Sequence, residues 1–239
     1  MTRSVYRGIL DLAVRHDAIP LNPVRSVGSL SSKADARVTV KDARRSFTRA
    51  ERDAVIAYAD TNLKAANRDL GDLIAFLGGT GARIGEACAL RWSALDLKAG
   101  TADLGPTVVR IKGRGLIIQE KGKTTMSQRT VRLPTWLVVR LMEGQLRAES
   151  NHLDVVFASP LGLLRDPSNT SHHIRDVLNE TGHPWASAHT FRKTVATLLD
   201  EAVVSARQSA SQFGRAKASM TMDVYMNRPT INERAAEVL

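Results

Sequence analysis

Thr80-Gly81-Ala82-Arg83-Ile84-Gly85-Glu86 is the stretch from which the organisation of this chain is best worked out. A helix is predicted to begin at Ile84, and the first turn of a helix presents free backbone N–H groups and the positive end of the helix dipole. Arg83 lies at that turn, and Glu86 follows one turn later, where it is able to pair with basic neighbours. On these residues alone, a surface arginine in an ion pair is the simpler interpretation.

Two nucleotide-binding motifs and the common metal motifs fail on spacing. The glycines around Gly81 resemble a dinucleotide fingerprint, but the third falls one place late and a helix, not a strand, precedes it. Gly122-Lys123-Thr124 resembles the end of a phosphate-binding loop, yet Ile117 stands where the first glycine belongs. No histidine and glutamate are spaced as in a zinc protease, and one cysteine cannot build a thiolate site. We therefore expect neither a cofactor nor a metal.

Charge is the informative feature of the composition. The 239 residues carry a formal net charge of +10, with a pI near 10.2, which attracts polyanions. Nucleic acid is the leading partner, because no basic amphipathic helix with an aromatic face suggests a membrane surface. The run 73–77 is too short to span a bilayer and no secretory segment follows Met1, so we expect a cytoplasmic protein. Cys88 excludes an intramolecular disulfide and is expected in the core.

The hydrophobic periodicity predicts a mainly helical α+β domain with a small antiparallel sheet of about three strands. A capping box of Thr48 and Glu51 opens one of its helices. The predicted helices are 48–62, 69–77 (ended by Gly78-Gly79), 84–90, 136–148, 170–180, 189–200, 205–213, 219–226 and 231–239, and the strands are 108–111, 116–118 and 130–133.

The N-terminal part is organised differently. Residues 4–16 predict one amphipathic helix, stopped by Pro20 and Pro23, which cannot bury its apolar face alone. Residues 28–46 form a basic linker whose charge suits a phosphate backbone, and a merely solvated linker is an equally open interpretation. Its candidate DNA-binding residues are Lys33, Arg37, Lys41, Arg44 and Arg45.

Three further stretches carry reactive side chains. His189-Thr190-Phe191-Arg192 places an imidazole and a guanidinium on one helix face, a pair that suits a phosphodiester. Residues 121–131 read as a basic turn between strands, whose tip is able to deliver an ammonium to a leaving oxygen. Residues 219–228 read as a short helix bearing Tyr225. Taken singly, a solvated face, an exposed turn and a half-buried core tyrosine are the simpler interpretations.

The order of these stretches resembles that of the tyrosine recombinases of the phage integrase type. The matching phrases are Thr80-Gly-Ala-Arg-Ile-Gly-Glu86, Lys123-Thr-x-x-Ser-x-Arg-Thr-Val131, His189-Thr-Phe-Arg-Lys193 and Ser219-Met-Thr-x-x-Val-Tyr225. The resemblance implies a catalytic domain over 47–228. Residues 1–27 resemble the last helix of the family's DNA core-binding domain, and both a shortened chain and an unusually short integrase are open. The resemblance also implies that the tail helix, 229–239, docks on a neighbouring protomer of a tetramer. The alternative is that this helix packs on its own domain.

The resemblance further implies roles for individual residues. Tyr225 is the nucleophile that forms a 3′-phosphotyrosyl link without ATP or metal. Arg83 and Arg192 clamp the phosphate, and His189 is the base. Lys123 is the general acid, with Lys121 as its competitor. Arg215 is a further catalytic residue that supplements the clamp, and Glu86 orients the arginines. Further DNA-binding candidates are Lys121, Arg129 and Lys193. Arg215 stands where the family usually has histidine, so it can donate to a phosphate but cannot exchange protons.

The implied partners are double-stranded DNA attachment sites, other copies of the chain, and an accessory directionality factor, in the cytoplasm at the nucleoid of the host cell. Two alternatives share these residues. One is a DNA-binding module of this fold that no longer cuts, and the other is a topoisomerase-like enzyme that relaxes DNA without strand exchange.

Overall fold

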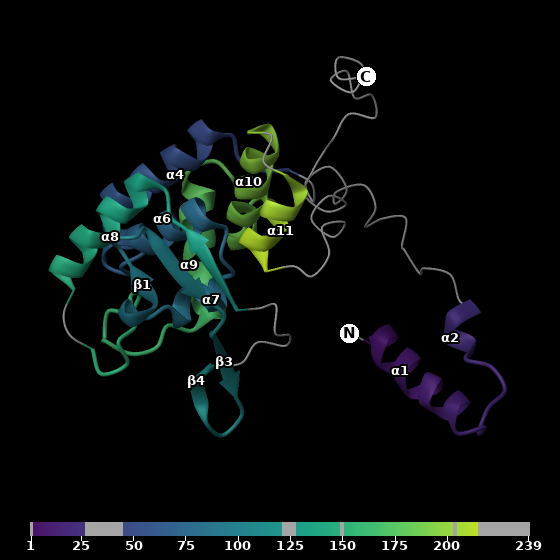
Figure 1. The fold of residues 1–239 in the computed structure, drawn as a ribbon. Helices are drawn as coiled ribbons and strands as arrows, with labels where there is room; N and C mark the ends of the chain where they lie inside the picture. Colours follow the sequence, from purple (N-terminus) through teal and green to yellow (C-terminus); the bar gives the residue numbers. More distant parts are fainter. Residues whose placement is uncertain (1, 27–44, 121–127, 149–150, 203–204, 215–239) are drawn as a thin grey trace, which may run out of the picture. The chain divides into compact units, whose positions relative to one another are not determined.

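A computed structural model describes residues 2–26, 45–120, 128–148, 151–202 and 205–214 (Figure 1). The chain divides into two compact units, Met1–Ala43 and Arg44–Leu239.

In the first unit, a buried asparagine holds a short second helix against the first one. Helix α1 (Thr2–Arg15) confirms the predicted helix, and α2 (Pro23–Ser26) follows it. The Asn22 amide donates to the Arg7 carbonyl at 3.0 Å and to the Asp11 carboxylate at 2.6 Å. Arg25 also binds Asp11, at 2.9 Å, and chiefly this hydrogen bond lowers the pKa of Asp11. The residues after Pro20 are thereby fixed to the side of α1.

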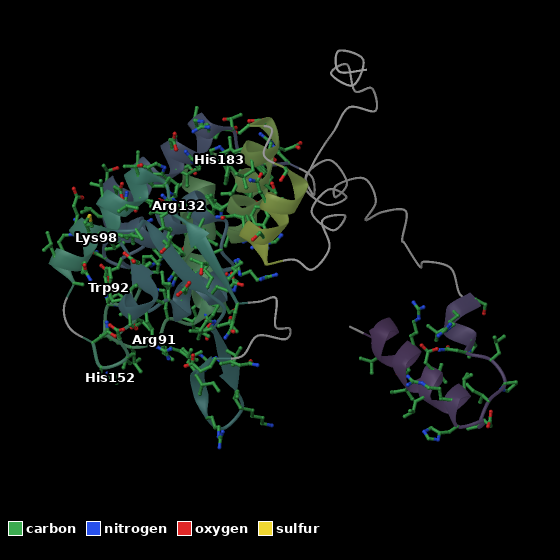
Figure 2. All side chains as sticks on the ribbon, in the orientation of Figure 1. Arg91, Trp92, Lys98, Arg132, His152 and His183 are labelled. Carbon is green, nitrogen blue, oxygen red and sulfur yellow. The ribbon has the colours of Figure 1, made fainter. Side chains whose placement is uncertain are left out.

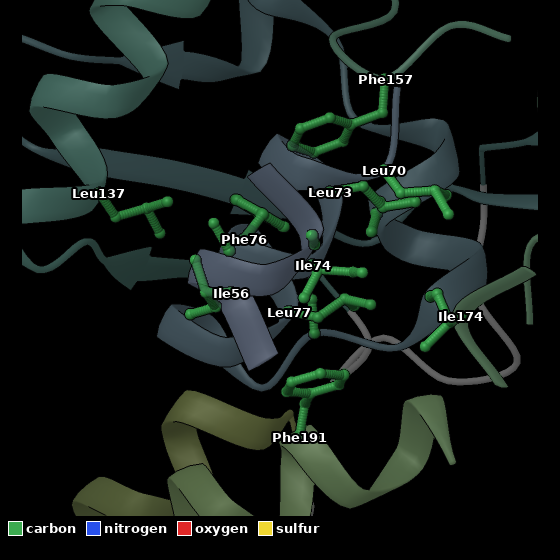
Figure 3. Close-up of a cluster of buried hydrophobic side chains, with 14 of the residues drawn as sticks. Ile56, Leu70, Leu73, Ile74, Phe76, Leu77, Leu137, Phe157, Ile174 and Phe191 are labelled. Atoms are coloured by element: carbon green, nitrogen blue, oxygen red, sulfur yellow. The ribbon is translucent and has the colours of Figure 1, made fainter. Parts of the chain in front are cut away.

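The second unit is built around a central apolar helix, α6 (Gly71–Thr80), whose residues 73–78 are all buried. Figure 3 shows Phe76 and Leu77 of this helix among side chains from α4, α8 and α10. Among the described residues, no helix is long and apolar enough to cross a bilayer. The other helices of this unit are α4 (Arg49–Thr61), α5 (Leu63–Ala66), α7 (Ile84–Ala89), the short 3₁₀ helix η1 (Trp92–Ala94), α8 (Thr135–Arg147), α9 (Pro167–Glu180), α10 (Ala188–Glu201) and α11 (Ala206–Phe213).

Helix ends show where local sequence signals hold and where packing overrides them. The capping box of α4 is confirmed: the Thr48 hydroxyl accepts from the Glu51 N–H at 3.1 Å, and the Glu51 carboxylate accepts from the Thr48 N–H at 2.7 Å. The predicted end of α6 at Gly78-Gly79 is wrong. The helix continues to Thr80 and ends at Gly81, whose φ of 67° suits glycine. A Cβ at Gly79 would lie 2.8 Å from Leu137 of α8, so this glycine permits close helix packing.

The strands are arranged in two sheets. Strands β1 (Leu95–Asp96), β2 (Thr101–Leu104) and β5 (Arg129–Arg132) form a three-stranded antiparallel sheet in the order β1-β2-β5. Strands β3 (Thr107–Ile111) and β4 (Gly115–Gln119) form a separate hairpin. The three predicted strand runs and a small antiparallel sheet of three strands are confirmed, but only the run 130–133 belongs to that sheet, because 108–111 and 116–118 pair with each other. Gly105-Pro106 follows β2, and a proline cannot donate to a strand ladder, so the chain leaves the first sheet there.

This topology changes the meaning of the basic turn. Strand β4 pairs with β3 and β5 pairs with β2, so residues 121–127 connect two sheets and are not the tip of a hairpin between paired strands. These residues themselves lie outside the described part of the chain.

Helix α7 packs closely against the hairpin. A Cβ at Gly85 would lie 2.4 Å from the Thr107 hydroxyl, a contact that real side chains do not make. Val108 is buried against Cys88 and Ala89 of α7. Burial raises the pKa of the Cys88 thiol to about 12, confirming the cysteine as a core residue. Gly85 therefore allows α7 to pack this closely against the hairpin.

We expect Gly85→Ala to lower the free energy of unfolding by about 1–3 kcal/mol, because the added methyl overpacks the contact with Thr107. Adding Thr107→Ala should recover most of the loss, since it removes the clashing hydroxyl. Gly8→Ala in α1 has open space around its Cβ and is the control. Urea unfolding measures all of these variants, and a Gly85→Ala protein as stable as the parent would contradict the expectation.

Candidate active site

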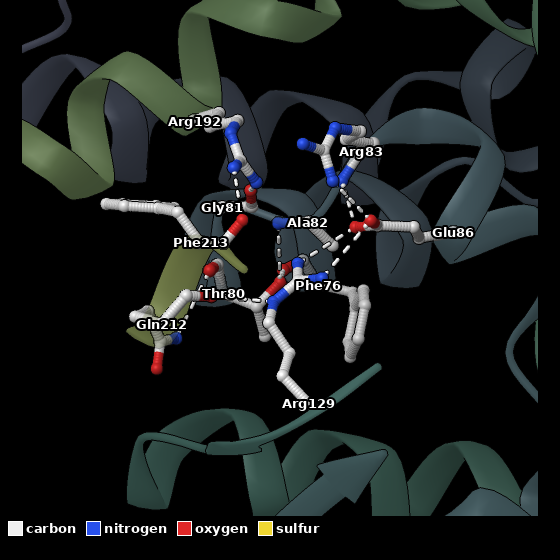
Figure 4. Close-up of polar contacts among 10 residues, drawn as sticks. All are labelled: Phe76, Thr80, Gly81, Ala82, Arg83, Glu86, Arg129, Arg192, Gln212 and Phe213. Carbon is white, nitrogen blue, oxygen red and sulfur yellow. Dashed lines mark hydrogen bonds and ion pairs between the residues drawn. The ribbon is translucent and has the colours of Figure 1, made fainter. Parts of the chain in front are cut away.

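A buried carboxylate lies at the centre of the opening stretch. The Glu86 side chain is 5% exposed and accepts a hydrogen bond from the Arg83 backbone N–H at 2.9 Å, which caps the N-terminus of α7. The same carboxylate accepts from the Arg83 guanidinium at 2.7 Å (Figure 4). Arg83 remains 48% exposed, so its guanidinium is held in place while still open to an anion.

Arg129 holds the other side of Glu86. Its two terminal nitrogens lie 2.9 Å and 3.2 Å from the two carboxylate oxygens, in the bidentate arrangement that suits a guanidinium. Burial by itself raises the pKa of Glu86, but the hydrogen bonds and charge of Arg129, with Arg83, hold it below its usual value. The Arg129 side chain is only 5% exposed. Its guanidinium is bonded to Glu86 inside the protein, and a contact of Arg129 with DNA stays a prediction.

Arg192 joins the opening stretch to the end of α11. One of its terminal nitrogens donates to the Gly81 carbonyl at 2.8 Å, and the other donates to the Phe213 carbonyl at 2.7 Å. Its guanidinium also lies 4.6 Å from the centre of the Phe213 ring. The residue is 1% exposed. In this conformation Arg83 is thus the more accessible of the two predicted clamp residues.

The last turn of α11 makes two more hydrogen bonds with this cluster, one as acceptor and one as donor. The Arg129 Nε donates to the Gln212 carbonyl at 2.8 Å, and the Gln212 amide donates to the Thr80 carbonyl at 3.3 Å. With Arg192, two guanidinium groups meet the C-terminal carbonyls of α11, where the helix dipole favours positive charge. One network of hydrogen bonds therefore joins residues 80–86, Arg129, Arg192 and residues 212–213.

The remaining predicted residues within the described chain lie on α10 and at its flank. His189 is exposed in the first turn of α10, which begins where the Ser187 N–H donates to the Thr190 hydroxyl at 3.0 Å. Lys193 is half-buried, and burial lowers its pKa. Arg45 lies over the Trp185 ring at 4.2 Å. Their roles toward a substrate stay predictions.

Several predicted residues lie outside the described part of the chain. Gly214 is the last described residue, directly after the Phe213 carbonyl that Arg192 binds, and Arg215 follows it in sequence. The predictions that lie outside the described part comprise the predicted helices 219–226 and 231–239 and the residues Lys33, Arg37, Lys41, Arg44, Lys121, Lys123, Arg215 and Tyr225.

Sequence reasoning missed the supporting roles of Arg129 and Gln212. A signal was available for Arg129. Side chains alternate across a strand, so Arg129 shares the face of the apolar Val131, and the structure buries both. For Gln212 no comparable pattern exists, because its partner is a main-chain carbonyl far away in sequence.

Comparison with known proteins yields a family and a fold. The model of the phage integrase family matches residues 45–230. A curated relative, a tyrosine recombinase XerC-like protein of Caldanaerobacter subterraneus subsp. tengcongensis, is 32% identical over 176 residues. The match covers 64% of this chain and 44% of the relative, so the chain spans less than half of that protein's length.

Solved structures show the same fold at low sequence identity. The integrase of transposon Tn1549, in complex with a circular intermediate DNA, matches 99% of this chain and 76% of its own at a TM-score of 0.81 and 17% identity. XerA recombinase matches with a TM-score of 0.61 at 19% identity, covering 100% of this chain and 75% of its own. A lambda integrase dimer bound to a core site matches with 0.60 at 16%, covering 97% and 74%.

We expect Arg129→Gln to lower the free energy of unfolding at neutral pH by about 3 kcal/mol, because it leaves the Glu86 carboxylate buried without its main cation. Burial then raises the pKa of Glu86 in the variant, so protonation restores stability as the pH falls. In the parent the pKa of Glu86 is lowered, and its contribution is lost only below the usual carboxyl range.

The difference between the two proteins should therefore be largest at neutral pH and shrink at mildly acidic pH, measured by urea unfolding. Arg132→Gln, on the exposed face of the same strand, is the matched control and should change little. A difference that is the same at both pH values would show that the Glu86 charge is not the cause.

Proposed function

Because the chain belongs to the phage integrase family, we propose that it is a site-specific DNA recombinase that breaks and rejoins strands through a covalent tyrosyl intermediate. The observation that carries this proposal is the state of Arg83. Its guanidinium is exposed, yet a buried carboxylate fixes it beside the junction that Arg192 makes with the end of α11. An immobilised, accessible cation is what an enzyme needs where negative charge develops on a phosphate.

The proposed cleavage step places named groups around one phosphodiester. The Tyr225 oxygen attacks phosphorus and forms the 3′-phosphotyrosyl bond, while the bond from phosphorus to the 5′ oxygen breaks. A phenol with an ordinary pKa of about 10 needs a base to lose its proton, and the exposed His189 is that base. Lys123 gives a proton to the departing 5′ oxygen, with Lys121 as the alternative donor.

Arginines stabilise the charge that builds on the nonbridging oxygens. Arg83 is the accessible clamp. Arg192 supports the site from the interior, and Arg215 is a further hydrogen-bond donor. Rejoining reverses these steps with the 5′-hydroxyl of another strand as nucleophile. The phosphotyrosyl ester conserves the energy of the original bond, so the exchange needs neither ATP nor metal.

The proposed partners are double-stranded DNA sites and other copies of the chain. The Tn1549 and lambda integrases of the same fold are known in complex with DNA. Residues 229–239 are proposed to dock on a neighbouring protomer as a tetramer assembles on two sites, and a directionality factor is a further candidate. We place the protein in the cytoplasm, on the nucleoid. A protein that binds DNA without cutting it would be the binding module, and one that relaxes DNA without strand exchange would be the topoisomerase-like enzyme.

Incubation with a nicked suicide duplex should trap a covalent adduct that survives denaturant, because the freed strand end diffuses away and cannot rejoin. Tyr225→Phe should abolish the adduct while leaving DNA binding unchanged. Tyr58→Phe, a change at an outer tyrosine bonded to Glu180, is the control and should retain it. Binding without any adduct would favour the non-cutting module, and relaxation of plasmids lacking a site would favour the topoisomerase.

Lys123→Ala should slow cleavage at least tenfold on an ordinary substrate, because the 5′ oxygen then leaves without a proton donor. A substrate with a 5′-bridging sulfur has a leaving group that needs no proton, so it should restore the rate of this variant. Gel assays of adduct formation measure both rates. Rescue of Lys121→Ala in place of Lys123→Ala would reassign the general acid.

A further inference from the structure

The β3–β4 hairpin is a firmly anchored arm. Its inner face, formed by Val108, Leu116 and Ile118, packs against α7. Arg110 of the same hairpin donates from two nitrogens to Asp166, at 2.9 Å and 2.6 Å, and Asp166 is the N-cap of α9. The hairpin is thus fixed to two helices, and Figure 1 shows it projecting from the rest of the second unit.

The tip of this arm is narrow and positively charged. Ile111 accepts from the Arg114 N–H at 3.1 Å, which closes the turn around Lys112 and Gly113. Gly113 and Gly115 have φ of 80° and 77°, and a Cβ at either would meet nothing within 4 Å. Lys112 and Arg114 are both exposed, and neither makes an ion pair within the described residues.

Some of the basic side chains on and beside the arm are already paired with carboxylates. Arg110, one residue pair from the turn, is paired with Asp166, and Arg91, outside the hairpin, is paired with Glu120 next to the end of β4 at 2.7 Å. The two positive charges that remain lie together at the tip, where side chains end in nitrogen in Figure 2. The exposed basic side chains of the arm without an ion pair among the described residues are thus those of its turn, Lys112 and Arg114, and they suit an anionic partner.

We propose that the β3–β4 hairpin is a second DNA-contacting element, in which Lys112 and Arg114 bind backbone phosphates outside the site of strand exchange. A two-stranded ribbon of this kind fits the major groove, and lysine and arginine are the usual phosphate ligands. A protein partner fits less well, because stable protein interfaces bury about 800 Å² on each side and the tip offers only a few residues.

The anchoring of the arm gives its reach. Its base contacts Gly85, two residues from Arg83, and a strand of five residues extends about 17 Å. At about 3.4 Å per base pair, this length limits the contacts of the tip to phosphates within about five base pairs of the one that Arg83 binds. This distance rests on the proposed function, whereas the phosphate contact itself does not.

The test is a salt titration of DNA binding by the full chain and by Lys112→Ala/Arg114→Ala. Each lost phosphate contact should reduce the slope of log K against log salt by about 0.9, so the double variant should lose about 2 units of slope. Lys98→Ala/Arg175→Ala removes the same charge from two exposed residues, one of them labelled well away from the hairpin in Figure 2, and should keep the parent slope.

A second experiment locates the contact. Neutral methylphosphonates placed one at a time along the duplex should weaken binding of the parent at positions within about five base pairs of the cleaved phosphate that do not affect the hairpin variant. Tip substitutions are exposed, and an unchanged Tm confirms that both proteins fold. An unchanged salt slope would overturn the proposal, even if the parent forms the tyrosyl adduct. A reduced slope without any adduct would support the hairpin contact and count against the proposed recombinase.

Discussion

The described site depends on one buried negative charge. A carboxylate removed from water is unfavourable unless cations and hydrogen bonds compensate for it, and Glu86 receives both from Arg83 and Arg129. The two arginines contribute unequally to this compensation. Arg129 is buried and supplies most of the compensation, which leaves Arg83 to share its guanidinium with solvent. A cation that faces the surface is thereby given the rigidity of the core.

The end of α11 is the second meeting point of distant segments. Main-chain carbonyls of Gln212 and Phe213 accept from Arg129 and Arg192, and Arg192 also binds the Gly81 carbonyl. Main-chain oxygens cannot change rotamer, so bonds to them define position more tightly than bonds between two long side chains. Strand β5, the end of α6 and helix α10 therefore all bond to the same two residues, 212–213. These two residues lie shortly before Arg215 in the sequence.

Local sequence patterns predicted what local physics determines. The capping box at Thr48, the helices around the core and the three strand runs were all confirmed. Strand partners were not predictable in the same way, because pairing is decided by where the chain leaves a sheet, here at Gly105-Pro106. Gly79 looked like a helix end and proved to be a packing position against α8. At the site, the motif order singled out Arg83 and Glu86, which the structure joins in an ion pair. The burial of the Arg129 side chain follows from its alternation with Val131 and was not predicted from its charge.

The burial of Cys88 has a practical side. Thiol-directed reagents react with the thiolate, and a thiol whose pKa is raised to about 12 in the core offers almost none of it at neutral pH. The only native cysteine of the chain, Cys88, is therefore expected not to react with maleimides. A cysteine introduced at a surface position would carry a fluorophore or spin label as the sole label, and distances between two protomers on DNA would be readable without first altering the core.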